Sequence, residues 1–139
     1  MKVVIDTNVL INCISSRTKY HAIWQAFLTG EITLYASTDV LLEYEELVLQ
    51  KYPVKIASDI IDILLDPDYV RQQDIYYYWN AISIDKDDNK FFDTAVASGA
   101  EYLVTNDGHF KSAKRLSFPK VNIISADDFL QILKSLFDE

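Results

Sequence analysis

The sequence Lys2-Val3-Val4-Ile5-Asp6-Thr7-Asn8 decides the fold of this chain. Residues 2–5 form a short, mostly β-branched run, which is typical of a buried strand. Three polar residues follow the run at once, and the apolar residues at 9–14 then predict a helix. A buried strand that passes directly into a helix is the unit from which parallel α/β sheets are built.

Strands and helices are predicted to alternate along the rest of the chain. Strands are expected at residues 32–36, 102–104 and 121–124, and helices at 21–28, 38–50, 56–64, 87–98 and 126–137. Thr38 is expected to be the N-cap of the helix at 38–50. Nearly all-apolar strands separated by helices predict a three-layer α/β/α fold with a central, mostly parallel sheet.

The segment from Tyr69 to Ile84 does not fit this regular pattern. Its aromatic and β-branched residues favour one or two strands, although polar insertions interrupt any clean period. The segment contains four consecutive aromatic residues, Tyr76 to Trp79. In a strand about half of them would project outward, and an exposed patch of that kind indicates a surface for self-association or for a protein partner.

Length and composition limit the classes of protein that the chain can be. Its 139 residues, 50% of them hydrophobic, are expected to form a single domain over residues 1–139. Neither a membrane span nor a signal peptide is recognisable, and the lone Cys13 suits a reducing compartment, so a cytoplasmic protein is expected. Two histidines and one cysteine argue against a zinc site. The net charge of −8 means that binding of a polyanion would need local positive charge.

Four carboxylates are expected to meet at one edge of the sheet. Asp6 and Asp107 each follow a predicted strand, and the carboxyl ends of parallel strands lie at the same edge. Helical periodicity places Glu43 at the border of an apolar stripe and Asp88 at the start of the buried face of its helix. The same periodicity places Asp93 on the outer flank of that helix.

A divalent cation is the expected partner of this carboxylate cluster. Because no Lys or Arg is expected to match the four charges, each carboxylate would favour its protonated form unless a cation neutralised the group. Ligands that are all oxygen suit Mg²⁺ or Mn²⁺. Taken one at a time, each acid also has a plainer role, as a helix cap, a solvated acid or a turn residue.

With these residues in this order, the sequence resembles the PIN-domain nucleases, in particular the toxin-type group that is often paired with an antitoxin. The resemblance covers nearly the whole chain and is carried by residues 4–11 (VIDTNVLI), 37–46 (STDVLLEYEE), 87–92 (DDNKFF) and 102–107 (YLVTND). It implies a central parallel sheet, a Mg²⁺ or Mn²⁺ site and hydrolysis of RNA phosphodiester bonds.

The resemblance also implies the residues of the site. The catalytic residues would be the acids Asp6, Glu43, Asp88 and Asp107. Of these, Asp6, Asp88 and Asp107 would bind the metal, and Glu43 would bind metal or orient a water. Asn8 and Thr105 match supporting polar positions.

Residues near the four acids complete the expected site. A dense basic group follows Asp107 and is expected to bind RNA phosphates beside the metal, although a solvated loop is an equal alternative; it comprises Lys111, Lys114, Arg115 and Lys120. Asp93 is expected to act through a metal-bound water. His109 is expected to be a solvated loop residue rather than a catalytic base.

The expected partners are an RNA substrate, an antitoxin protein and a second copy of the chain in a homo-oligomer. Two other classes stay open. The first is a catalytically inactive PIN-like interaction module. The second is a receiver-type phosphoacceptor domain, which would need adjacent acids after the first strand, whereas Asp6 is followed here by Thr7.

Overall fold

The central strand of the sheet is buried on both faces. The computed structural model describes residues 1–137, and in it β1 (Lys2–Ile5) carries three apolar side chains that are at most 1% exposed, those of Val3, Val4 and Ile5. Burial of an apolar side chain of this size contributes about 1.5–3 kcal/mol. Such a run is stable only in the middle of a sheet that is covered on both sides.

β1 has a parallel neighbour on each side. The five strands lie in the order β3-β2-β1-β4-β5, and each neighbouring pair is parallel. The other strands are β2 (Thr33–Ala36), β3 (Val70–Gln72), β4 (Tyr102–Val104) and β5 (Ile123–Ile124). The chain order reverses between β1 and β4, and in α/β sheets ligands bind beyond the carboxyl ends of the strands at such a point. The predicted parallel α/β fold is confirmed.

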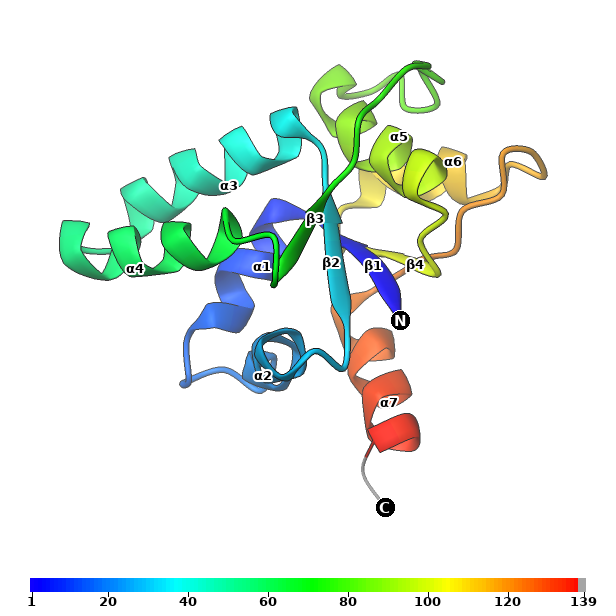
Figure 1. Ribbon diagram of the computed structural model, residues 1–139. Helices are drawn as coiled ribbons and strands as arrows, with labels where there is room; N and C mark the ends of the chain where they lie inside the picture. The colour runs from blue at the N-terminus through cyan, green and yellow to red at the C-terminus, as the bar shows by residue number, and fades with distance from the viewer. Residues whose placement is uncertain (138–139) are drawn as a thin grey trace.

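Helices cover both faces of the sheet. They are α1 (Thr7–Ile14), α2 (His21–Thr29), α3 (Thr38–Lys51), α4 (Val54–Leu64), α5 (Asn89–Ser98), α6 (Lys111–Lys114) and α7 (Ala126–Phe137), with 3-10 turns η1 (Lys86–Asp88) and η2 (Gly108–Phe110). Helix α5 packs on β1, β2 and β4, whereas α1 lies on the opposite side of the sheet and packs against α2 and α3 (Figure 1). Among residues 1–137, no helix is both long and apolar enough to cross a membrane.

The sequence predicted most element bounds to within two residues, and two of the differences at helix starts concern residues next to the sheet edge. Ser37, not Thr38, is the N-cap of α3, because its hydroxyl accepts a hydrogen bond from Val40 N at 3.3 Å. The helix expected from residue 87 begins instead at Asn89, after η1, and Asp88 is its N-cap residue. The N-cap residues of these two helices are thus Ser37 and Asp88.

The segment after β3 is not the strand that the sequence predicted. After Gln72 it runs without regular structure to Asp85. Gln73 N still donates to the Ala36 carbonyl of β2 at 2.9 Å. Further along, side chains of α5 hold the backbone: the Asn89 amide bonds both N and O of Ile82, at 2.8 and 2.9 Å, and Asp93 Oδ1 accepts from Trp79 N at 3.1 Å. Period and propensity reveal only pairing between strands, so they missed this arrangement.

The aromatic run in this segment faces solvent more than a strand would allow. Tyr76, Tyr77 and Tyr78 are 87%, 64% and 67% exposed, so the expectation that half would project outward was too low. Only Trp79 is half-buried; its ring packs against those of Tyr77 and Phe118, with centroids 4.6 and 5.7 Å apart. The segment therefore exposes three tyrosine rings, and its backbone is held by the side chains of Asn89 and Asp93 on α5.

Candidate active site

Asp6 is a buried carboxylate at the carboxyl end of the central strand. Its side chain is not the cap of α1; instead Oδ2 accepts a hydrogen bond of 2.6 Å from the Thr105 hydroxyl. Burial raises the pKa of Asp6, the Thr105 bond opposes the rise, and the nearby charges of Asp107 and Glu43 add to it. The role of Asp6 as a helix cap and nothing more is thereby excluded.

Thr105 connects the ends of β1 and β4. Its hydroxyl donates to Asp6 and accepts from the backbone N of Asp107 at 3.0 Å. Asp6 and Asp107 line one cavity of about 290 Å³, together with Asn8 on the exposed side of α1. The structure thus brings together two of the predicted acids and both of the predicted supporting residues.

Glu43 reaches the same edge from α3. Its Oε2 accepts a short hydrogen bond from the hydroxyl of Thr7, and its Oε1 forms an ion pair of 2.8 Å with Lys90. The neighbouring Tyr44 is fully buried, and its hydroxyl donates to the carbonyl of Ile5, which anchors α3 to the end of β1. The inward placement of Glu43 is therefore explained by a buried tyrosine beside it.

Lys90 corrects the expectation that no cation matches the acids. Its ammonium group pairs with Glu43 and, at 3.0 Å, with Asp87. Lys90 lies on α5, and the periodicity of that helix alone does not predict that its side chain reaches α3. Only the packing of the two helices brings this charge to the site.

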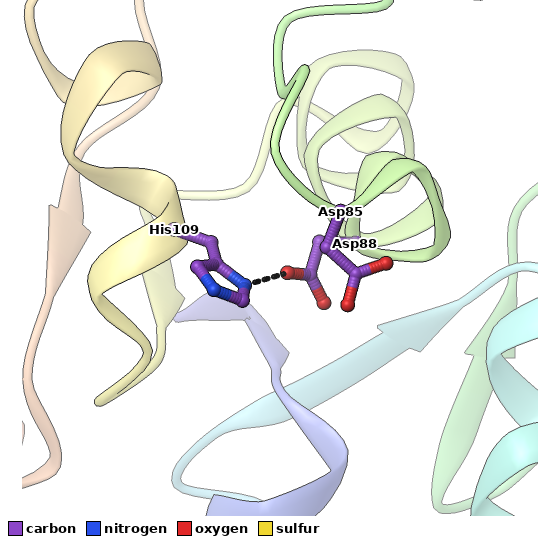
Figure 2. A group of neighbouring side chains, drawn as sticks. All are labelled: Asp85, Asp88 and His109. Carbon is purple, nitrogen blue, oxygen red and sulfur yellow. Dashed lines mark hydrogen bonds and ion pairs between the residues drawn. The ribbon is translucent and has the colours of Figure 1, made fainter.

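Asp88 lies between the sheet edge and His109. His109 Nδ1 is 3.2 Å from Asp88 Oδ2 and 3.3 Å from Asp107 Oδ1, and Figure 2 shows the imidazole facing the Asp88 carboxylate. Partial burial raises the pKa of Asp88 to about 6, the bond from His109 lowers it, and the charges of Asp107, Asp85 and Asp6 add to the rise. The Asp88 carboxylate is therefore electrostatically part of the same acidic group.

His109 is not the solvated loop residue that the sequence suggested. Asp107 caps the turn η2, since its Oδ1 accepts from His109 N at 2.9 Å, and this cap turns the imidazole toward the acids. Within residues 1–137, Asp85, Asp88 and His109 form the one group of side chains whose ligand atoms all lie within 4.8 Å of one another (Figure 2). Asp85 and His109 were both missed, because each depends on how a turn folds back rather than on a periodic pattern.

The placement of Asp93 on the outer flank of its helix was wrong. The side chain is only 3% exposed, and burial raises its pKa while the hydrogen bond from Trp79 N opposes the rise. The helical angle was measured against the sheet alone, whereas the segment from Gln73 to Ile84 covers this flank of α5. Asp93 therefore holds the aromatic segment in place.

The basic group lies beyond η2, next in the chain to His109. Lys111, Lys114 and Arg115 are exposed on and after the short helix α6, and Lys120 is exposed in the following loop. The loop expected at residues 111–115 is therefore partly helical.

The residues at the sheet edge fit a divalent cation. Asp6 and Asp88 each have a raised pKa to which neighbouring carboxylates contribute, so the group lacks positive charge at its centre. The donors are carboxylate oxygens with one imidazole nitrogen, which is a suitable set for a divalent metal. Lys90 neutralises Glu43 and leaves the acids on β1, β4 and η1 as the candidate ligands.

Comparison with protein families identifies the chain. A model of the PIN domain matches residues 2–109, a span that includes all four predicted acids. The chain belongs to the PIN domain family. Membership confirms the resemblance found in the sequence and supports a nuclease function for the acidic edge. A comparison with curated protein sequences gives no match.

Three solved structures are similar to this PIN domain. VapBC2 from Rickettsia felis, solved bound to a DNA fragment from its promoter, has a TM-score of 0.63 at 20% identity over 90% of this chain and 98% of that one. VapBC-1 from nontypeable Haemophilus influenzae gives 0.60 at 16% identity, over 91% and 99%. FitAcB from Neisseria gonorrhoeae gives 0.57 at 17% identity, over 89% and 97%. At these identities the likeness is one of fold.

Burial of the Asp6 carboxylate is expected to lower the stability of the metal-free protein at neutral pH. In metal-free protein at pH 7, Asp6→Asn should raise the melting temperature by a few degrees, because it removes a buried charge whose pKa is raised in the folded state. The gain should shrink as the pH falls toward the ordinary pKa of an aspartate, where the wild-type carboxyl is protonated whether folded or not. Thermal melts in EDTA at both pH values measure the difference.

Asp127→Asn is the matched control for this experiment. Asp127 is exposed, and its pKa is lowered by hydrogen bonds from Lys19 and Tyr20, so removal of its charge should not raise the melting temperature. A lower melting temperature for Asp6→Asn than for wild type would contradict the argument.

Proposed function

We propose that this PIN domain is a ribonuclease that uses Mg²⁺ or Mn²⁺ to hydrolyse RNA phosphodiester bonds. The observation that supports this most is the buried Asp6, which shares the point of strand reversal with Asp107 and is flanked by Glu43 and Asp88. Burial of a carboxylate without a cationic partner costs stability, and a bound cation would remove much of that cost. The position of Asp6 therefore favours a role in binding a cation.

Asp6, Asp88 and Asp107 would hold the metal. When bound, a divalent ion lowers the pKa of a coordinated water and neutralises charge on the phosphate oxygens. The Thr105 hydroxyl fixes Asp6, and the backbone N of Asp107 fixes Thr105, so one side chain links the two acids that follow β1 and β4. Positioned ligands of this kind reduce the entropy cost of the reaction.

Glu43 would orient the attacking water. One of its oxygens is held by Thr7 and the other by Lys90, so the carboxylate has a single orientation at the border of the site. Lys90 is then a positioning residue that also limits the repulsion between Glu43 and the metal-binding acids. No protein nucleophile is needed, because water attacks the phosphorus directly.

We also propose that the protein is the toxin of a toxin-antitoxin pair. This proposal is supported by the resemblance of the sequence to the toxin-type group and by the likeness in fold to VapBC2, VapBC-1 and FitAcB. The toxin would act in the cytoplasm, where its RNA substrate would be. A gene for a small DNA-binding protein directly beside this one would support the pairing.

Loss of the metal ligands tests the proposed activity. Asp6→Asn and Asp88→Asn should each reduce cleavage of single-stranded RNA by at least about a hundredfold, since even outer-shell changes at metal sites cost about 10–100-fold. Excess EDTA should abolish the wild-type activity. Cleavage is measured as the initial rate with end-labelled RNA at a fixed Mg²⁺ or Mn²⁺ concentration.

Asp93→Asn is the control from the same helix. An asparagine oxygen can still accept the hydrogen bond from Trp79 N, so this variant should lose only a modest part of the activity. Full wild-type activity in EDTA would refute the proposed function. A greater loss in Asp93→Asn than in Asp88→Asn would refute the assignment of the ligands.

The exposed basic group should determine how tightly RNA binds. In the inactive Asp6→Asn background, replacing Lys111, Lys114 and Arg115 by Ala should weaken binding of single-stranded RNA and reduce its dependence on salt. Each lost phosphate contact lowers the slope of log K against log[salt] by about 0.7, so the three changes together should lower it by about 2. Fluorescence anisotropy over a range of KCl measures the slope; an unchanged slope would mean that these residues face solvent only.

The exposed aromatic segment should take part in association with protein. Tyr76→Ser with Tyr78→Ser removes two exposed rings and leaves the packing of Tyr77 on Trp79 intact, so the melting temperature should hardly change. The double variant should nevertheless lose self-association or affinity for the antitoxin, because large exposed apolar patches mark contact surfaces. Sedimentation velocity, alone and with the antitoxin, measures both; unchanged behaviour in both would refute this role.

A further inference from the structure

We propose that His109 is a metal ligand, and that its imidazole makes the site select Mn²⁺ over Mg²⁺. This inference rests on the metal site of the proposed function and extends it by one residue and by the identity of the ion. No pattern in the sequence marks His109 as a ligand, since the chain has only two histidines and one cysteine. The carboxylates around it come from other elements of the fold.

The spacing of the donor atoms supports a shared ion. His109 Nδ1 lies 3.2 Å from Asp88 Oδ2 and 3.3 Å from Asp107 Oδ1. Ligand atoms about 2.1 Å from an octahedral ion lie about 3.0 Å apart when adjacent. The Asp88 and His109 donors therefore already lie close to the spacing of two adjacent ligands of one ion. Asp85 contributes a further carboxylate within 4.8 Å of the Asp88 and His109 donors (Figure 2).

The backbone fixes the imidazole where a ligand is needed. The N–H of His109 donates to Asp107 Oδ1 at 2.9 Å, and the N–H of Asp107 donates to Thr105. This chain of bonds runs back to Asp6, so the position of His109 follows from the geometry of the acids themselves. The His109 side chain is 41% exposed, which leaves an ion and its waters access from solvent.

The chemistry of the donors decides which ion is preferred. Mg²⁺ is a hard ion that binds oxygen ligands and keeps several waters. Mn²⁺, a transition ion, coordinates imidazole nitrogen more readily than Mg²⁺ does, and less strongly than the later first-row ions do. A site made only of carboxylates discriminates weakly between Mg²⁺ and Mn²⁺. One nitrogen ligand adds affinity for Mn²⁺ without adding any for Mg²⁺.

Metal binding to the purified protein tests the inference without any RNA. By titration calorimetry, His109→Ala should weaken Mn²⁺ binding by at least about tenfold, as loss of a group at a metal site does, and should leave Mg²⁺ binding within a factor of about two. His109→Asn should weaken Mn²⁺ binding as His109→Ala does, because it places an oxygen donor near the site but removes the imidazole nitrogen. His21→Ala is the matched control and should leave the affinity for both ions unchanged, because His21 Nδ1 contacts the Cys13 carbonyl instead.

A spectroscopic measurement shows whether the nitrogen is bound directly. Pulsed EPR of the Mn²⁺-loaded protein with ¹⁵N-labelled histidine should show a coupling that His109→Ala removes and His21→Ala retains. The absence of this coupling in wild type would overturn the inference. An equal loss of affinity for Mn²⁺ and Mg²⁺ in His109→Ala would also overturn it. Cleavage of RNA with Mg²⁺ would then still stand, whereas failure to bind either ion would refute the proposed metal site as well.

Discussion

The structure depends on one constraint, the placement of an ionisable carboxylate at the end of a strand that is buried on both faces. β1 must be central because its side chains are almost fully buried, and Asp6 follows it into the interior, where it is 6% exposed. Burial raises the pKa of Asp6, and the charges of Asp107 and Glu43 raise it further. Thr105 reduces it with a hydrogen bond, and a bound cation would reduce it further.

The surrounding elements are tied to the same point. Tyr44 donates to the last carbonyl of β1 and so positions α3, with Glu43 beside it. Lys90 extends from α5 to Glu43, and the side chains of Asn89 and Asp93 on the same helix hold the segment that follows β3. Helix α5 therefore supports the sheet, the acidic site and the aromatic surface. In a chain with a net charge of −8, the same helix thus packs on the sheet and supplies the lysine that pairs with an acid of the site.

Local positive charge is distributed unevenly around the acids. Lys90 pairs with the outer carboxylates of Glu43 and Asp87, and His109 faces Asp88 and Asp107. Neither contacts Asp6, whose pKa is lowered by hydrogen bonds from the Thr105 hydroxyl and the Thr7 backbone. Asp6 therefore has neutral hydrogen-bond donors and no cationic partner, and a cation held by oxygen ligands is the group that best balances it. The two cavities at this edge, one lined by Asp6 and the other by Glu43, leave room for a substrate on either side.

The sequence by itself determined the parallel α/β fold and predicted that four acids lie near one edge of the sheet, because both follow from local patterns: apolar strands, helical periodicity, and polar residues at strand ends. It failed where a side chain is positioned by an element distant in the chain. Asp93 was assigned to the wrong flank, since the segment that covers it is irregular and has no period. Lys90, Asp85 and His109 were missed for a similar reason: their contacts form only when α3, η1 and η2 meet. Tertiary structure alone decided these contacts, because the distance between two elements is set by packing and not by the spacing of residues within either one.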